Sequence, residues 1–169
     1  MVMQNLTARD IIRIALDVEQ TGMHSYREMK QATQDQELNK LLEYLEEEEA
    51  EHVSLFSKMF KDIEIDLATM PDPSPDDQAY LDSILKSTVF EGPQAGIKRA
   101  KEAKTPIDIL KLSLQFERDA MLFWTRLHKM VRESDRHLIQ QLIDQENKHV
   151  KDIEYLLNQR QRTEPKKFW

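Results

Sequence analysis

The chain has 169 residues, of which 40% are apolar and 33% charged, a balance typical of one globular domain rather than of a disordered protein. A net charge of −7 argues against a nucleic-acid-binding protein, which would show a basic stripe. Because there is no cysteine, disulfides, cysteine-ligated zinc and rubredoxin-type iron sites are excluded within these residues. The sequence has no apolar run of membrane-spanning length and no signal-peptide pattern, so we expect a cytoplasmic protein without a membrane partner.

Two long helices are predicted in the first part of the chain. Apolar residues at helical spacing place them over residues 7–32 and 35–61, with a short turn between them. Three prolines in the stretch MPDPSPDD (70–77) prevent a helix there. A shorter helix is expected over 76–89, with one or two further turns near 94–103.

A second pair of long helices follows. A Thr-Pro pair typical of a helix start opens the third helix, predicted over 105–131, and the fourth is predicted over 134–161. Two such pairs separated by a crossover of roughly 45 residues are the pattern of a four-helix bundle with one long crossover. We therefore predict an all-α fold with a single domain over 1–162, a short extra helix in the crossover, and a C-terminal tail at 163–169.

One glutamate interrupts the apolar stripe of each long helix. These residues are Glu19, Glu49, Glu117 and Glu146. An ionised carboxylate in a core is strongly unfavourable unless it is paired or bound to a metal, and the stripes offer no Lys or Arg. Glu49 and His52 form a Glu-x-x-His motif, as do Glu146 and His149, and residues three apart share a helix face.

The two halves of the chain repeat this pattern. Glu19 precedes Glu49 by 30 residues, and Glu117 precedes Glu146 by 29, so antiparallel neighbours would bring all four to one height. Ferritin-like di-iron and di-manganese proteins bind two ions with one Glu from each of two helices and Glu-x-x-His from the other two. We therefore predict a ferritin-like bundle with a binuclear metal site made by Glu19, Glu49, His52, Glu117, Glu146 and His149.

Other polar residues near these motifs receive different predictions. Within the acidic run 46–51, we expect Glu48 to be peripheral and three other glutamates to be solvated, namely Glu46, Glu47 and Glu51. The remaining histidines are expected at the surface or in structural roles: His24, His128 and His137. Tyr26 shares a face with Glu19, and three roles are open for it: a hydrogen bond to a ligand carboxylate, a redox-active neighbour, or simple packing.

The sequence resembles the ferritin-like superfamily, and within it the rubrerythrin-type branch. The matching elements are Glu19 with Tyr26 seven residues on, Glu49-Ala-Glu-His52, Glu117, and Glu146-Asn-Lys-His149. The resemblance implies a non-haem centre of two iron ions, with one histidine on each iron and with Glu49 and either Glu117 or Glu146 as bridges. Manganese or zinc would suit the same ligands.

Two departures from this branch bear on activity. Rubrerythrins usually carry a further Glu three residues after the third-helix ligand, where this chain has Ala120, and a rubredoxin domain, which these cysteine-free residues cannot build. We expect an oxidoreductase that reacts with peroxide or dioxygen, with an external electron donor if it is a peroxidase. The alternatives are a ferroxidase that stores or delivers iron and a metal-free structural bundle, and a homodimer is compatible with each.

Overall fold

The computed structural model describes residues 8–63, 74–76, 79, 93–103, 105–130, 133 and 136–163. Within these residues the chain forms five α-helices: α1 (Ala8–Ala32), α2 (Gln36–Ile63), α4 (Pro93–Glu102), α5 (Pro106–Met130) and α6 (Arg136–Thr163). The four long helices confirm the four predicted ones, and α4 is the further helix expected near 94–103. The prediction of a helix over 76–89 falls mostly outside the described residues, as does that of a tail after residue 163.

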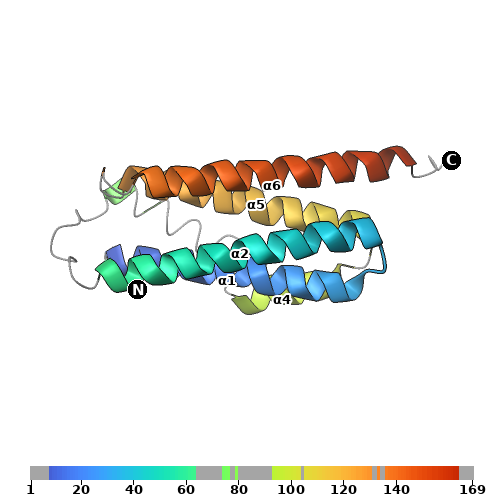
Figure 1. Ribbon diagram of the computed structural model, residues 1–169, viewed down its shortest axis with the longest axis horizontal. Coiled ribbons are helices and arrows are strands. Elements are labelled where there is room, and N and C mark those ends of the chain that lie inside the picture. The colour runs from blue at the N-terminus through green and yellow to red at the C-terminus, as the bar shows by residue number, and fades with distance from the viewer. Residues whose placement is uncertain are drawn as a thin grey trace.

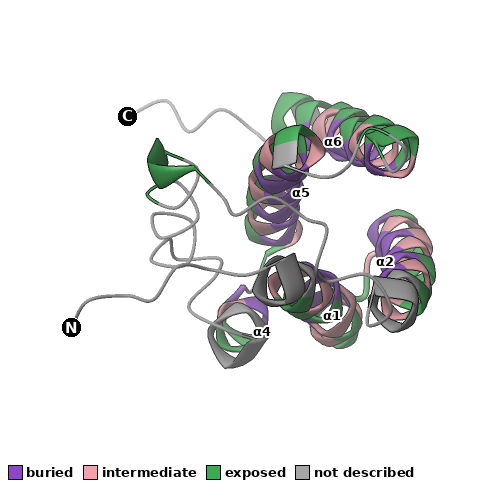
Figure 2. Cartoon of the chain, turned by 90° about the vertical axis from the view of Figure 1, so that its left-hand side faces the viewer, coloured by how far each residue is buried: buried purple, intermediate pink, exposed green. Residues whose placement is uncertain are grey.

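The long helices pack as two antiparallel pairs (Figure 1). Helix α1 lies along α2 and α5 lies along α6, while contacts of α1 with α5 and of α2 with α6 close the bundle. Helices α2 and α5 run in the same direction, which requires a long connection between them. Helix α4 packs on the outside of α1 (Figure 2). None of the helices in the described ranges has the length and apolarity needed to cross a membrane.

Side-chain caps fix where the second helix of the first pair and the first helix of the second pair begin. Asp35 Oδ1 accepts hydrogen bonds from the N–H groups two and three residues on, both at 3.1 Å, and also binds Arg160 of α6 at 2.9 Å. Thr105 and Asp108 bind each other reciprocally: Thr105 Oγ1 accepts from the Asp108 N–H at 3.1 Å, and Asp108 Oδ2 accepts from the Thr105 N–H at 3.3 Å. These caps set the register at which α2 and α5 present their buried glutamates.

The apolar core consists of two clusters, one toward each end of the bundle. One cluster includes Tyr26, Leu45, Phe116 and Val150, and the other includes Ala15, Phe56, Trp124 and Leu142. Each long helix contributes residues to both clusters. In each helix the predicted glutamate ligand separates the residues of one cluster from those of the other. A polar layer therefore divides the core near the middle of the bundle.

Candidate metal centre

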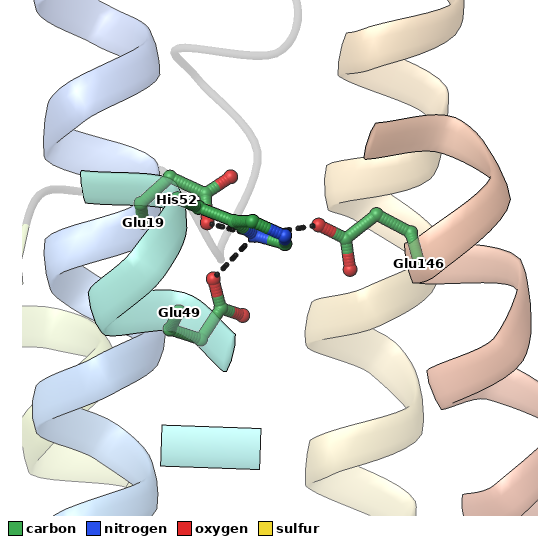
Figure 3. Close-up of side chains that lie close together, drawn as sticks. All are labelled: Glu19, Glu49, His52 and Glu146. Atoms are coloured by element: carbon green, nitrogen blue, oxygen red, sulfur yellow. Dashed lines mark hydrogen bonds and ion pairs between the residues drawn. The ribbon is translucent and has the colours of Figure 1, made fainter. Parts of the chain in front are cut away.

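The structure buries all six predicted ligands and brings them together in the polar layer. Two overlapping groups have ligand atoms within 4.8 Å of one another: Glu19, Glu49, His52 and Glu146 form the first, and Glu117, Glu146 and His149 the second. Figure 3 shows the first group, with side chains from α1, α2 and α6 pointing toward one another. Glu146 is the member that the two groups share.

The same ring nitrogen of each histidine faces the carboxylates. His52 Nδ1 lies 3.0 Å from Glu19 Oε2, 3.4 Å from Glu49 Oε2 and 3.5 Å from Glu146 Oε1 (Figure 3). His149 Nδ1 lies 3.2 Å from Glu146 Oε2 and 3.3 Å from an oxygen of the α5 glutamate. The two oxygens of Glu146 thus reach toward both imidazoles, whose ring centres are 6.3 Å apart. Of the two residues expected to bridge with Glu49, Glu146 has the position that suits this role.

Without cations, the electrostatics of this layer favour protons. Burial raises the pKa of three of the carboxyls well above the usual range, and the negative charges of their neighbours add to the effect: Glu19, Glu49 and Glu146. Burial also raises the pKa of Glu117, but hydrogen bonds with Glu146, His149 and Tyr26 outweigh it and lower that pKa. Burial lowers the pKa of His149, yet its carboxylate partners outweigh this and raise it to about 11.

The donor set fits divalent metal ions. Three buried carboxylate oxygens have no hydrogen-bond partner among the described residues: Glu19 Oε1, Glu49 Oε2 and Glu146 Oε1. An unsatisfied buried acceptor costs about 1–3 kcal/mol, and more when it is charged. Carboxylates with imidazoles are ligands that iron, manganese and zinc all accept, and two divalent ions would balance four carboxylate charges. The layer therefore has the chemistry of a binuclear site.

The backbone of α1 approaches Glu49 so closely that any side chain at position 22 would have to displace the end of the Glu49 side chain. A Cβ atom on Gly22 would lie 2.9 Å from Glu49 Oε1 and 3.1 Å from its Cδ, closer than such atoms normally come. Sequence reasoning missed this residue. The available signal was a glycine inside a predicted helix, three residues after Glu19, where it costs the helix about 1 kcal/mol relative to alanine.

Tyr26 is fully buried and donates its O–H to Glu117 Oε1. Burial raises the pKa of its phenol well above the usual range, and the nearby carboxylates act in the same direction. Of the roles left open for Tyr26, the structure shows the hydrogen bond to a predicted ligand carboxylate. The bond joins α1 to α5, across the two halves of the repeat.

The acidic run of α2 differs from expectation at Glu46. Its side chain is only 16% exposed and binds Arg27 at 2.7 Å and Lys30 at 3.2 Å, both on α1. The prediction of a solvated Glu46 was therefore wrong, because the α1–α2 contact reaches this position. Glu47 and Glu51 are exposed, as predicted.

Sequence reasoning also underestimated Glu48 and overlooked Gln145. Glu48 Oε2 lies 3.8 Å from His149 Nε2, and Gln145 Oε1 lies 3.2 Å from His52 Nε2.

The histidines expected to lie elsewhere, His24, His128 and His137, belong to neither metal-ligating group among the described residues. Ala120, which stands where rubrerythrins usually carry a further glutamate, lies in an apolar cluster.

Replacing Gly22 with alanine should weaken metal binding without weakening the fold. The added methyl group must displace the end of the Glu49 side chain, while alanine favours the helix by about 0.5–1 kcal/mol. We expect an unchanged or higher melting temperature for the metal-free protein and a loss of Zn(II) affinity on the order of tenfold or more. Calorimetry on the same two proteins measures both quantities, and an unchanged affinity would contradict the close approach.

Replacing Glu49 with glutamine should largely abolish the increase in melting temperature caused by metal, while the metal-free protein should stay as stable as wild type. Burial raises the pKa of Glu49 well above its usual range and so favours the protonated carboxyl, which an amide can replace in the metal-free protein. A metal at 100 times its Kd adds about 2.7 kcal/mol, which corresponds to roughly 5–10 °C for a chain of this size. We expect thermal unfolding to show this increase for wild type and for the exposed control Glu47→Gln, and a much smaller one for Glu49→Gln. Equal increases in all three proteins would contradict the assignment.

Comparison with known proteins gives one match. A family model described as Rubrerythrin matches residues 10–95, which include most of α1, all of α2 and the first Glu-x-x-His motif. The searches of curated proteins and of solved structures returned no match. The matched region covers half of the chain and contains the ligands of the first group that α1 and α2 supply. The chain therefore belongs to the rubrerythrin family of ferritin-like di-iron proteins.

Proposed function

We propose that this protein binds two iron ions in the polar layer and uses them as an oxidoreductase that reduces peroxide or dioxygen. The observation that carries the proposal is the pair of overlapping buried ligand groups that share Glu146. Their carboxylate and imidazole donors are those of ferritin-like binuclear centres. All six residues lie in the core, so a bound ion would be shielded from bulk water.

Iron bound there would supply the electrons: each peroxide consumes two electrons and two protons and yields two water molecules. These electrons must be returned by a donor outside these 169 residues, which contain no cysteine for a rubredoxin-type site. The chain's own residues provide the surroundings. Four carboxylates compensate the positive charge of the ions, Glu146 reaches both imidazoles, and the two apolar clusters exclude water on either side.

Tyr26 is proposed to take part by holding Glu117. Its O–H donates to Glu117 Oε1, and the raised pKa of the phenol keeps that proton on the oxygen at neutral pH. A carboxylate held by such a bond has a fixed orientation and a reduced tendency to take up a proton. Tyr26 thereby positions a ligand that lies on the other pair of helices.

One observation favours a second function, ferroxidation for iron storage or delivery. Ala120 lies in an apolar cluster at the position where rubrerythrins usually carry a further glutamate. The site then has six ligands, the number found in the basic ferritin-like set. A ferroxidase would react with dioxygen while Fe(II) is its substrate, whereas a peroxidase would react faster with peroxide. We propose a homodimer for either function, because symmetric dimers are the commonest assemblies.

Rapid mixing of the anaerobic Fe(II)-loaded protein with one equivalent of peroxide, or with dioxygen, tests these proposals. We expect wild type to be oxidised faster than a Glu49→Ala/His52→Ala variant, and faster by peroxide than by dioxygen. Tyr26→Phe should slow the reaction by about 10–100-fold, the usual effect of removing a hydrogen bond to a metal ligand. Faster oxidation by dioxygen would favour the ferroxidase, and equal rates in wild type and double variant would contradict both functions.

A further inference from the structure

The outward-facing nitrogens of the two buried histidines meet different partners. His52 Nε2 lies 3.2 Å from Gln145 Oε1, and His149 Nε2 lies 3.8 Å from Glu48 Oε2. Glu48 and Gln145 occupy equivalent places in the repeat, since each directly precedes the glutamate of a Glu-x-x-His motif. Helix α2 thus places Glu48 near the histidine of α6, and helix α6 places Gln145 near the histidine of α2.

A hydrogen bond between these two residues fixes the orientation of the amide. Gln145 Nε2 donates to Glu48 Oε2 at 3.4 Å, so Gln145 turns its amide oxygen toward His52. An amide oxygen and a carboxylate oxygen can only accept, so the Gln145 amide accepts from His52 Nε2, while the Glu48 carboxylate lies 3.8 Å from His149 Nε2, beyond hydrogen-bond distance. The neighbour of His52 Nε2 is thus a neutral amide, and that of His149 Nε2 is a carboxylate.

Glu48 brings a carboxylate near the outer nitrogen of His149 without forming a hydrogen bond to it. His149 Nε2 is buried and has no hydrogen-bond partner within the described part of the chain. The Tyr44 ring and the imidazole pack in a T-shaped arrangement with ring centres 5.6 Å apart, and the phenol oxygen of Tyr44 accepts from Lys148 at 2.8 Å. Glu48 is 24% exposed at its side chain, so it lies at the boundary between the buried layer and solvent.

We propose that Glu48 and Gln145 are positioning residues that make the two metal positions unequal. This inference rests on the proposed binding of two metal ions in the polar layer, where Nδ1 of each histidine faces the carboxylates. A metal at Nδ1 would leave the proton on Nε2. The nearby Glu48 carboxylate could then turn to accept from this N–H, which would make the imidazole a stronger ligand than the neutral amide makes its partner. The position at His149 therefore fills before the position at His52.

Stepwise addition of Zn(II) to the metal-free protein tests the order of filling. Proton–nitrogen correlation spectra report each of the five imidazoles separately, including which ring nitrogen carries the metal. In wild type we expect His149 to change during the first equivalent and His52 during the second. Glu48→Gln should lower the affinity of the His149 position by about 10–100-fold and remove this order.

Exchange of the two residues separates position from charge. The double variant Glu48→Gln/Gln145→Glu keeps the composition and net charge of wild type, and we expect it to reverse the order so that His52 changes first. Glu47→Gln removes one negative charge from an exposed place on the same helix turn and should leave the order unchanged. Melting temperatures of the metal-free variants check that each protein is folded.

Four results would overturn the inference in distinguishable ways. Simultaneous changes of both imidazoles in wild type would show equal positions, and an unchanged order in the exchanged variant would show that Glu48 and Gln145 do not set it. The same loss of order in Glu47→Gln would assign the effect to net charge. Absence of any Zn(II) binding by wild type would contradict the proposed function itself, and this inference with it.

Discussion

The whole arrangement depends on keeping four carboxylates in one dry layer between two apolar clusters. Each long helix contributes one of them, so all four helices must meet at the same height with these side chains facing inward. Unpaired, such charges would oppose folding by several kcal/mol, an amount comparable to much of the stability of a domain. In the absence of metal, protons and the two imidazoles reduce the charge, as the raised pKa values of Glu19, Glu49 and Glu146 show. Divalent cations would satisfy the same constraint and would also bind the oxygens that lack partners among the described residues.

Helix periodicity and the duplicated motif were sufficient to predict most of the fold and the burial of the six residues. Each predicted ligand interrupts an apolar stripe, and a carboxylate on such a stripe has few explanations. The residues that were missed depend on contacts between helices. The closeness of Gly22 to Glu49 and the contact of Gln145 with His52 follow from the separation and rotation of neighbouring helices, which no single stripe encodes. Glu46 was misjudged for the same reason, since its partners belong to α1.

The two halves of the chain also correspond at residues near the predicted ligands, and the differences between these residues give the two halves of the site different surroundings. Gly22 and Ala120 each follow a buried glutamate by three residues, so a small residue occupies this place in both halves. Seven residues after the same glutamates stand Tyr26, which binds Glu117, and Trp124, whose Nε1 has no hydrogen-bond partner among the described residues. With Glu48 and Gln145, these pairs show a symmetric ligand set held in unequal surroundings. The six predicted ligands would allow metal to bind, and we propose that their surroundings make the two metal positions differ.

The metal content of the purified protein tests the central claim most directly. Plasma mass spectrometry on protein loaded anaerobically with Fe(II) and freed of loosely bound ions gives the number of ions per chain. Two overlapping ligand groups predict about two ions per chain in wild type and loss of bound iron in the Glu49→Ala/His52→Ala variant. Wild-type protein that retains no iron, or as little as the folded variant, would contradict a binuclear centre in this layer.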